Sequence, residues 1–208
     1  MLFKDQISAG EKLAPALSGY KNAVILAIPR GGVATGFGLA KKLNLPLDIV
    51  VTRKISAPTN PELAIGAVGE TKGSLWLNQE LVEQLGVSQE YLDQEIKTQK
   101  QEIKRREKVY RQGRPAREIK KKTVVLVDDG LATAATMMAA IREIRNCQPR
   151  KVAVAVPVAA SETISLLKKE ADEVLCLETP RLFFSVSQWY QDFKQYSDQE
   201  VIELLNFP

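Results

Sequence analysis

The 208-residue sequence predicts an α/β protein in which helices flank a doubly wound, mostly parallel β-sheet. Short runs rich in Val, Ile and Leu alternate with helical patterns, which is the order of βαβ units. Several runs are continuously apolar, as expected of strands covered on both faces. Ligands of such sheets bind in the loops at the carboxyl ends of the strands, so functional residues are expected there.

Each element follows from its local pattern. The expected strands are residues 23–28, 47–52, 64–68, 74–77, 123–127, 151–156 and 173–177. Apolar residues at helical spacing predict helices over 32–43, 88–112 and 132–145, and a capping-box pattern at Ser197 opens a last helix. Residues 1–158 are predicted to form the core, including a long basic helix near 88–112. Residues 159–208 are a small C-terminal add-on that completes the core or a hood.

The composition excludes several classes of chemistry. The sequence contains no histidine, which rules out Ser-His-Asp and Cys-His nucleophile systems, imidazole acid–base catalysis and histidine-ligated zinc. Its two cysteines, Cys147 and Cys176, are far apart and form no CxxC pair, so a thiolate metal site is not expected. Any reaction must rely on carboxylates, Lys and Arg side chains, hydroxyls, backbone amides or a hard cation such as Mg²⁺.

The net charge of +4 is unevenly distributed along the chain. Residues 97–122 contain twelve basic and three acidic side chains, whereas the remainder is acidic overall. The favoured interpretation is a solvated helix; the alternatives are a patch for nucleic acid or another anion, and an oligomer contact. Tyr110 is the only aromatic residue in this segment, so base stacking, and with it a nucleic-acid partner, is not expected.

We expect a cytoplasmic protein with no membrane partner. The longest apolar run, residues 152–160, is nine residues long and contains Pro157. A helix that crosses a bilayer needs about 20 apolar residues. Two scattered cysteines also fit a reducing compartment.

The strongest candidate site follows the strand 123–127. Two adjacent acids, Asp128 and Asp129, precede a loop of small residues and then a helix. The loop places free backbone N–H groups and two hydroxyls at a helix N-terminus, which suits a phosphate. The carboxylates could accept hydrogen bonds from ribose hydroxyls, so the pattern predicts a ribose 5-phosphate site. The alternative is an acid pair that caps the helix, although unpaired buried carboxylates are costly. The loop residues are Gly130, Leu131, Ala132, Thr133, Ala134, Ala135 and Thr136.

Two further loops carry residues suited to anions. Arg30, Gly31 and Gly32 follow the strand 23–28, where the glycines allow close backbone approach and Arg30 adds charge. A tight turn without a ligand is the alternative. Arg53 and Lys54 close the strand 47–52 and precede a proline-punctuated stretch. This basic pair could instead protect a solvated sheet edge.

Together, these loops resemble type I phosphoribosyltransferases, over about residues 20–160. The segment from residue 124 matches that family's motif of four apolar residues, two acids, three loop residues and Thr-Gly-x-Thr, with Ala134 in place of the usual Gly. The Arg-Gly-Gly loop is similar to the family's diphosphate loop, which often contains a non-proline cis peptide. The Arg-Lys pair is similar to the base of its mobile loop. The arrangement looks similar to a poorly characterised bacterial branch of the family.

The resemblance implies transfer of a phosphoribosyl group from 5-phosphoribosyl 1-diphosphate (PRPP) to a small nitrogenous acceptor. Asp128 and Asp129 would be catalytic residues that hold the ribose hydroxyls and meet Mg²⁺ only indirectly, through PRPP. Residues 132–136 would hold the 5′-phosphate, with an affinity that Ala134 would lower if its position required positive φ. The diphosphate would lie on Arg30, Gly31 and Gly32, beside the catalytic pair Arg53 and Lys54. Family members are commonly dimers, so a homodimer is expected.

The remaining candidates lie in the mobile loop and the C-terminal segment. The resemblance places Thr59, Asn60 and Glu62 at the tip of the mobile loop and turns Glu70 toward the pocket. Four aromatic residues could stack on an acceptor base, although a terminal aromatic cluster more often completes a core. They are Phe183, Phe184, Trp189 and Tyr190. The alternative function is a catalytically silent regulator that senses PRPP or nucleotides and binds nucleic acid through the basic segment.

Overall fold

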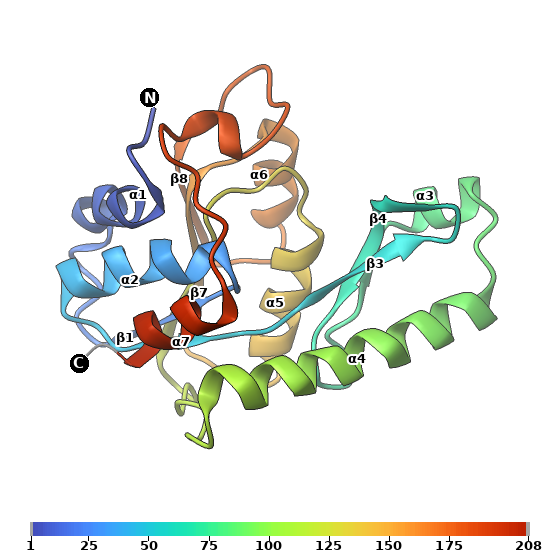
Figure 1. Ribbon diagram of the computed structural model, residues 1–208, viewed down its shortest axis with the longest axis horizontal. Coiled ribbons are helices and arrows are strands. Elements are labelled where there is room, and N and C mark those ends of the chain that lie inside the picture. The colour runs from blue at the N-terminus through green and yellow to red at the C-terminus, as the bar shows by residue number, and fades with distance from the viewer. Residues whose placement is uncertain (1, 207–208) are drawn as a thin grey trace.

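A five-stranded parallel sheet forms the centre of the computed structural model, which describes residues 2–206 (Figure 1). All of its recorded strand pairings are parallel. The predicted mostly parallel sheet is therefore confirmed. In spatial order its strands are β2 (Leu47–Ile49), β1 (Ala23–Ala27), β6 (Thr123–Val127), β7 (Lys151–Val158) and β8 (Glu173–Glu178).

Helices cover both faces of this sheet, which is why β1 and β6 are buried along their whole length. Alternate residues of the central strands point to opposite faces. Val24 and Leu126 pack with α5 (Ala135–Arg145) and α6 (Ser161–Leu167). Ile25 and Val125 pack on the other face, with α1 (Gln6–Leu13), the 3₁₀ turn Ala14–Leu17 and α2 (Gly31–Leu43).

A second, antiparallel sheet was not predicted. It contains β3 (Arg53–Ala57), β4 (Asn60–Val68) and β5 (Trp76–Leu77), and extends from the main sheet as an arm with α3 (Gln79–Gln84) and α4 (Gln89–Arg111) (Figure 1). The prediction that Arg53 and Lys54 close a strand is wrong, because β2 ends at Ile49 and these residues open β3. The chain leaves the parallel sheet after β2 and begins a hairpin.

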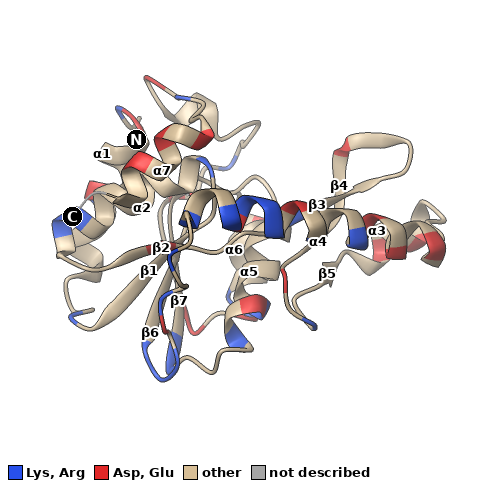
Figure 2. Cartoon of the chain, turned by 60° about the horizontal axis from the view of Figure 1, so that its bottom comes forward, with Lys and Arg blue, Asp and Glu red and all other residues tan. Residues whose placement is uncertain are grey.

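The long helix α4 carries the basic segment. Figure 2 shows basic residues along its C-terminal half and acidic residues at the end beside α3. Leu92, Ile103 and Tyr110 form its buried stripe, and the Tyr110 hydroxyl donates to Asp198 Oδ1 at 2.8 Å. The prediction of a long, mostly solvated helix near 88–112 agrees with this arrangement.

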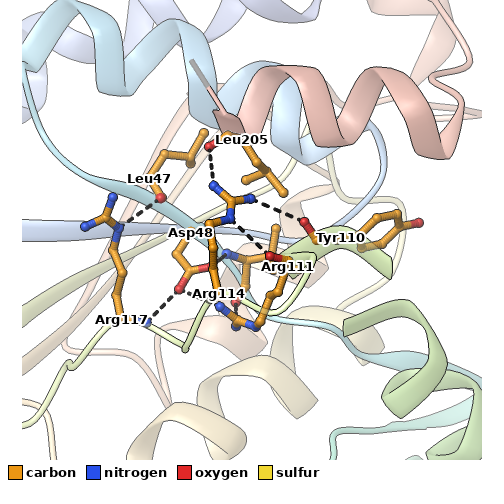
Figure 3. Close-up of polar contacts among 8 residues, drawn as sticks. Leu47, Asp48, Tyr110, Arg111, Arg114, Arg117 and Leu205 are labelled. Atoms are coloured by element: carbon orange, nitrogen blue, oxygen red, sulfur yellow. Dashed lines mark hydrogen bonds and ion pairs between the residues drawn. The ribbon is translucent and has the colours of Figure 1, made fainter. Parts of the chain in front are cut away.

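An arginine cluster anchors the end of α4 to the main sheet (Figure 3). Arg111 Nη1 lies 2.6 Å and 2.7 Å from the two carboxylate oxygens of Asp48 in β2. The backbone N–H of Arg117 donates to the same carboxylate at 2.8 Å. Arg114 donates to the carbonyl oxygen of Leu205 in α7 (Asp198–Asn206) at 3.2 Å. These basic residues join three elements.

The C-terminal segment completes the core. β8 is the edge strand of the parallel sheet, and the chain then returns through a 3₁₀ turn, Ser187–Trp189, to reach α7. Tyr190 and Phe3 form an isolated parallel β-bridge, and the centroids of their rings are 5.5 Å apart. The short helices α1, α3 and α6 were not predicted. Among the described residues, no helix is long and apolar enough to cross a membrane.

Candidate active site

Two of the candidate loops meet at the switch point of the parallel sheet. β1 and β6 are neighbours, β1 has β2 on its other side, and β6 has β7. The connections that follow β1 and β6 therefore diverge, and a crevice opens at the carboxyl ends of these strands. Arg30 follows β1 here, and Asp128 follows β6.

A cavity of about 520 Å³ opens at this crevice. Its lining combines the loops after β1 and β6 with β3, β4, α4 and the C-terminal segment. Arg30, Gly31, Arg53 and Lys54 line it together with the acid pair and most of the small-residue loop. The full lining is Ile28, Pro29, Arg30, Gly31, Thr52, Arg53, Lys54, Ser56, Pro61, Gln99, Asp128, Asp129, Gly130, Leu131, Ala132, Thr133, Thr136 and Val186.

The two glycines after β1 allow the two loops to pack against each other. A Cβ atom on Gly31 would lie 1.8 Å from Asp129 Oδ2. One on Gly32 would lie 2.8 Å from Asp128 Oδ1. Any side chain larger than hydrogen at either position would displace a carboxylate, so these glycines serve close approach to the acid pair.

Two helix N-termini lie at this cavity, because Gly31 of α2 and Thr136 of α5 line it. α2 begins at Gly31 after Arg30, and α5 begins at Ala135 after Ala134; neither helix has a side-chain N-cap. The first N–H groups of an uncapped helix need a partner and favour anions. The Pro29–Arg30 peptide bond is cis, as in the loop that the resemblance implied.

Ala134 adopts an ordinary helical conformation, with φ −79° and ψ −16°. Its position therefore does not require the positive φ that would favour glycine. Thr133 and Thr136 line the cavity, and the Thr136 carbonyl accepts a hydrogen bond from Thr52 Oγ1 at 3.2 Å. Ala134 and Ala135, in the same loop, are buried and do not line the cavity.

The acid pair carries two adjacent carboxyl groups, and the charge of Lys54 offsets only part of the cost of burying them. Burial, and then the neighbouring charge of Asp129, raise the pKa of Asp128 well above its usual range. Burial likewise raises the pKa of Asp129 to about 6. The backbone N–H of Asp129 donates to Asp128 Oδ1 at 2.9 Å. Such a pair is stabilised by hydroxyl donors or a cation.

The acid pair fits an indirect role toward Mg²⁺. Carboxylate oxygens are the donors that this ion prefers. Within residues 2–206, however, no group of three or more acidic or cysteine side chains is placed to hold a metal. The ion would therefore need most of its ligands from a bound phosphate compound and water.

Arg53 and Lys54 enter the cavity from the first residues of β3. Arg53 is half-buried, and its Nε donates to Gln99 Oε1 on α4 at 2.9 Å. The hairpin reaches the cavity through Ser56 and Pro61. Its tip residues Thr59, Asn60 and Glu62 lie in the turn and the start of β4 and do not line the cavity.

The structure does not bring Glu70 to this cavity. Glu70 lines a separate cavity with Glu107 and Glu143, beside α4 and α5. β4 ends at Val68, and the loop that follows carries Glu70 toward α4 and α5 and away from the switch point.

The four aromatic residues do not line the cavity either. Tyr190 is buried against Phe3 as part of a core cluster in which Phe183 and Trp189 are partly buried, and Phe184 is 79% exposed. The Tyr190 hydroxyl donates to the backbone carbonyl of Asp129. Phe183, Trp189 and Tyr190 therefore belong to a core cluster that supports the acid loop. From this segment, the residue that lines the cavity is Val186.

Sequence reasoning missed Thr52, Gln99 and Val186. Val186 packs against Gly130, where a Cβ atom would lie 2.6 Å from Val186 Cγ1, and no feature of the sequence near Val186 indicates this contact. Gln99 is partly buried, but it belongs to the polar sequence of α4, which carries no indication of a neighbouring cavity. Only the arrangement of α4 across β3 places it there.

Comparison with known proteins identifies the family. A family model described as phosphoribosyl transferase domain matches residues 9–194. A curated protein of Mycobacterium tuberculosis, provisionally named a phosphoribosyl transferase in two strains, is 41% identical over 99% of this chain. The alignment covers 46% of that protein, so the chain spans about half the length of the curated relatives it matches.

A solved structure matches along nearly the whole chain. The crystal structure of the protein TT1426 from Thermus thermophilus has a TM-score of 0.83 and 42% identity, and the match covers 99% of this chain and 98% of that one. The parallel five-stranded sheet has the α/β architecture of type I phosphoribosyltransferases. With the family model matching most of its length, the chain belongs to the phosphoribosyl transferase family.

Proposed function

We propose that this protein uses PRPP and Mg²⁺ to transfer a phosphoribosyl group to a small nitrogenous acceptor, with release of diphosphate. One observation carries the proposal. A single cavity gathers the acid pair, two uncapped helix N-termini and the cationic side chains of Arg30, Arg53 and Lys54. A sugar with a phosphate at one end and a diphosphate at the other requires this combination of groups.

Each group has a role that follows from its charge. The N-terminus of α5, with Thr133 and Thr136, would bind the 5′-phosphate, and the N-terminus of α2 would bind the diphosphate. Asp128 and Asp129 would accept hydrogen bonds from the ribose hydroxyls. Bound on PRPP, Mg²⁺ would neutralise part of the leaving group's charge.

The reaction needs no histidine. Cleavage of the C1–O bond leaves positive charge on the sugar and negative charge on the departing diphosphate. Arg30, Arg53 and Lys54 would stabilise the developing charge on the diphosphate, while the nearby carboxylates would stabilise the cationic sugar. A hairpin above the cavity would help to keep water from the reactive sugar.

Isothermal titration calorimetry with PRPP and Mg²⁺ tests the binding step. The double variant Asp128→Asn/Asp129→Asn should lower PRPP affinity by at least about 100-fold, because two hydrogen bonds to charged acceptors are weakened. Asp93→Asn on the exposed side of α4 is the matched control and should bind like the unmutated protein. Absence of PRPP binding to the unmutated protein would disprove the proposal.

A diphosphate-release assay with a panel of purines, pyrimidines and other nitrogenous acceptors then tests turnover. Release that depends on one acceptor supports a transferase and identifies its second substrate. PRPP binding without release for any acceptor would instead support the silent regulator. The cytoplasmic location and the homodimer stay predictions.

A further inference from the structure

The helix α4 contributes a residue to the cavity that nothing in the sequence marked as functional. Gln99 lines the cavity beside Arg53, although 46 residues separate them in the chain. The Arg53 Nε donates to Gln99 Oε1 at 2.9 Å, and Gln99 Nε2 donates to Glu95 Oε1 at 2.8 Å. The amide thus links the arginine at the cavity to an acid one turn earlier in the same helix.

These contacts fix the orientation of the amide. An amide has one end that accepts and one that donates, and the two ends are not interchangeable here. Glu95 can only accept from the Gln99 nitrogen, so the Gln99 oxygen is turned toward Arg53. The result is a relay from Glu95 through Gln99 to the guanidinium.

Arg53 keeps its charge available for a ligand. Its Nε is used by Gln99, whereas none of the recorded ion pairs among residues 2–206 joins its two terminal nitrogens to a carboxylate. Burial, and then the charge of Arg106, lower the pKa of Arg53, while the carboxylates of Glu102 and Glu95 act in the opposite direction from positions where they pair with Arg105, Arg106 and Gln99. Such a guanidinium is suited to a bidentate phosphate contact.

We propose that Gln99 is a positioning residue that holds the Arg53 guanidinium for the diphosphate of PRPP, with Glu95 orienting its amide. The inference rests on the proposed function of this cavity. A neutral amide fixes the arginine by one hydrogen bond without cancelling its charge. A carboxylate at position 99 would hold the arginine equally well but would compete with the diphosphate.

Calorimetry with three probes distinguishes a loss of Arg53 positioning from a general loss of structure in the cavity. The probes are PRPP with Mg²⁺, inorganic diphosphate with Mg²⁺, and ribose 5-phosphate, which lacks the diphosphate. Gln99→Ala and Gln99→Glu should each weaken the first two by about tenfold, and should leave ribose 5-phosphate affinity unchanged. Gln101→Ala and Gln101→Glu are the matched controls, because Gln101 is exposed on the same helix.

A double-mutant cycle tests whether Gln99 acts through Arg53. In an Arg53→Ala background, Gln99→Ala should cause no further loss of PRPP affinity, since the group that it positions is gone. Additive losses, equal weakening of all three probes, or unchanged binding of PRPP by both Gln99 variants would each overturn the inference. If the unmutated protein binds neither PRPP nor diphosphate, the proposed function itself fails.

Discussion

Individual residues in the cavity are set by close packing as much as by charge. Gly31 and Gly32 lie against the two carboxylates, and Gly130 lies against Val186. The Tyr190 hydroxyl donates a hydrogen bond to the backbone carbonyl of Asp129, and Tyr190 itself does not line the cavity. The acid pair therefore has a fixed backbone, so any added atom at these contacts must move a group that faces the cavity.

Gly31→Ala tests this constraint. Gly31 is helical, so alanine is compatible with the backbone, but its Cβ would lie 1.8 Å from Asp129 Oδ2. We expect PRPP affinity to fall by about tenfold or more and stability to fall by about 1–3 kcal/mol, through overpacking. Calorimetry and urea unfolding measure the two effects.

Gly19→Ala is the control for this substitution, because nothing lies within 4 Å of a Cβ at that position. It should leave both quantities near those of the unmutated protein. Wild-type PRPP affinity in Gly31→Ala would show that the carboxylate can move without loss of binding.

The sequence predicted those candidate site residues that lie in loops directly after recognisable strands. It missed those that reach the cavity only through the packing of distant elements. Asp128 and Arg30 were predicted as site candidates because Asp128 directly follows the buried strand β6 and Arg30 lies in the short loop after the buried strand β1. Glu70 was expected at the pocket from the resemblance alone, whereas the loop after β4 places it beside Glu107 and Glu143. Gln99 could not be predicted, since only the crossing of α4 over β3 makes it part of the cavity.

At the scale of elements, the arm is tied to the main body by polar contacts around the loop after β4. Glu143 of α5 accepts from the backbone N–H and the hydroxyl of Thr71, both at 2.9 Å. Lys100 of α4 donates to the Thr71 carbonyl at 3.3 Å. Glu70, in the same loop, interacts with Glu107 of α4. This loop therefore joins α4, α5 and the antiparallel sheet.

The Glu70–Glu107 contact makes this junction sensitive to pH. Burial, and then the hydrogen bond with Glu70, raise the pKa of Glu107 from 4.5 to about 7. Because the folded protein holds this proton more tightly than the unfolded chain, the stabilisation is complete below about pH 4.5 and is lost as pH rises through about 7. Between these values, stability should fall as pH rises.

Glu107→Gln removes the titration while it keeps the size of the side chain. We expect the variant to lose this pH dependence and to exceed the unmutated protein in unfolding free energy above neutral pH, on the order of 1 kcal/mol after solvent screening. Urea unfolding across this pH range measures the difference. Glu118→Gln, at an exposed position, should track the unmutated protein, and parallel curves for Glu107→Gln would contradict the prediction.

The arm also marks where element prediction from sequence reaches its limit. The central strands β1 and β6 of the parallel sheet are continuous apolar runs, and all five strands of this sheet are predicted to within a few residues. β3 contains the polar sequence Arg53-Lys54 and pairs with β4 through register shifts near Ser56. A short, irregular and half-exposed hairpin has no clear two-residue period, so only its apolar end, within 64–68, was recognised.

Across the whole molecule, basic residues of the segment 97–122 form ion pairs and hydrogen bonds that join distant parts of the chain. Several side chains of the basic segment pair with carboxylates of the same chain: Arg105 and Arg106 pair with Glu102, and Arg111 pairs with Asp48. Arg114 reaches the carbonyl of Leu205 near the end of the described chain. These contacts favour the solvated-helix interpretation, because a nucleic-acid surface needs cations that are free to bind phosphate.

Asp48→Asn tests this long-range connection. The Asp48 and Arg111 side chains are only 12% and 16% exposed, so the variant leaves a poorly solvated cation without its partner. We expect a loss of about 2–4 kcal/mol in the free energy of unfolding, measured by urea titration. PRPP affinity should be unchanged under native conditions, since Asp48 does not line the candidate active site. Arg105→Ala is the control, because Arg105 is 54% exposed in its pair with Glu102 and its loss should change the free energy of unfolding much less than Asp48→Asn does. Equal losses for the two variants would mean that the basic segment contributes only surface charge, and that packing alone joins α4, β2 and α7.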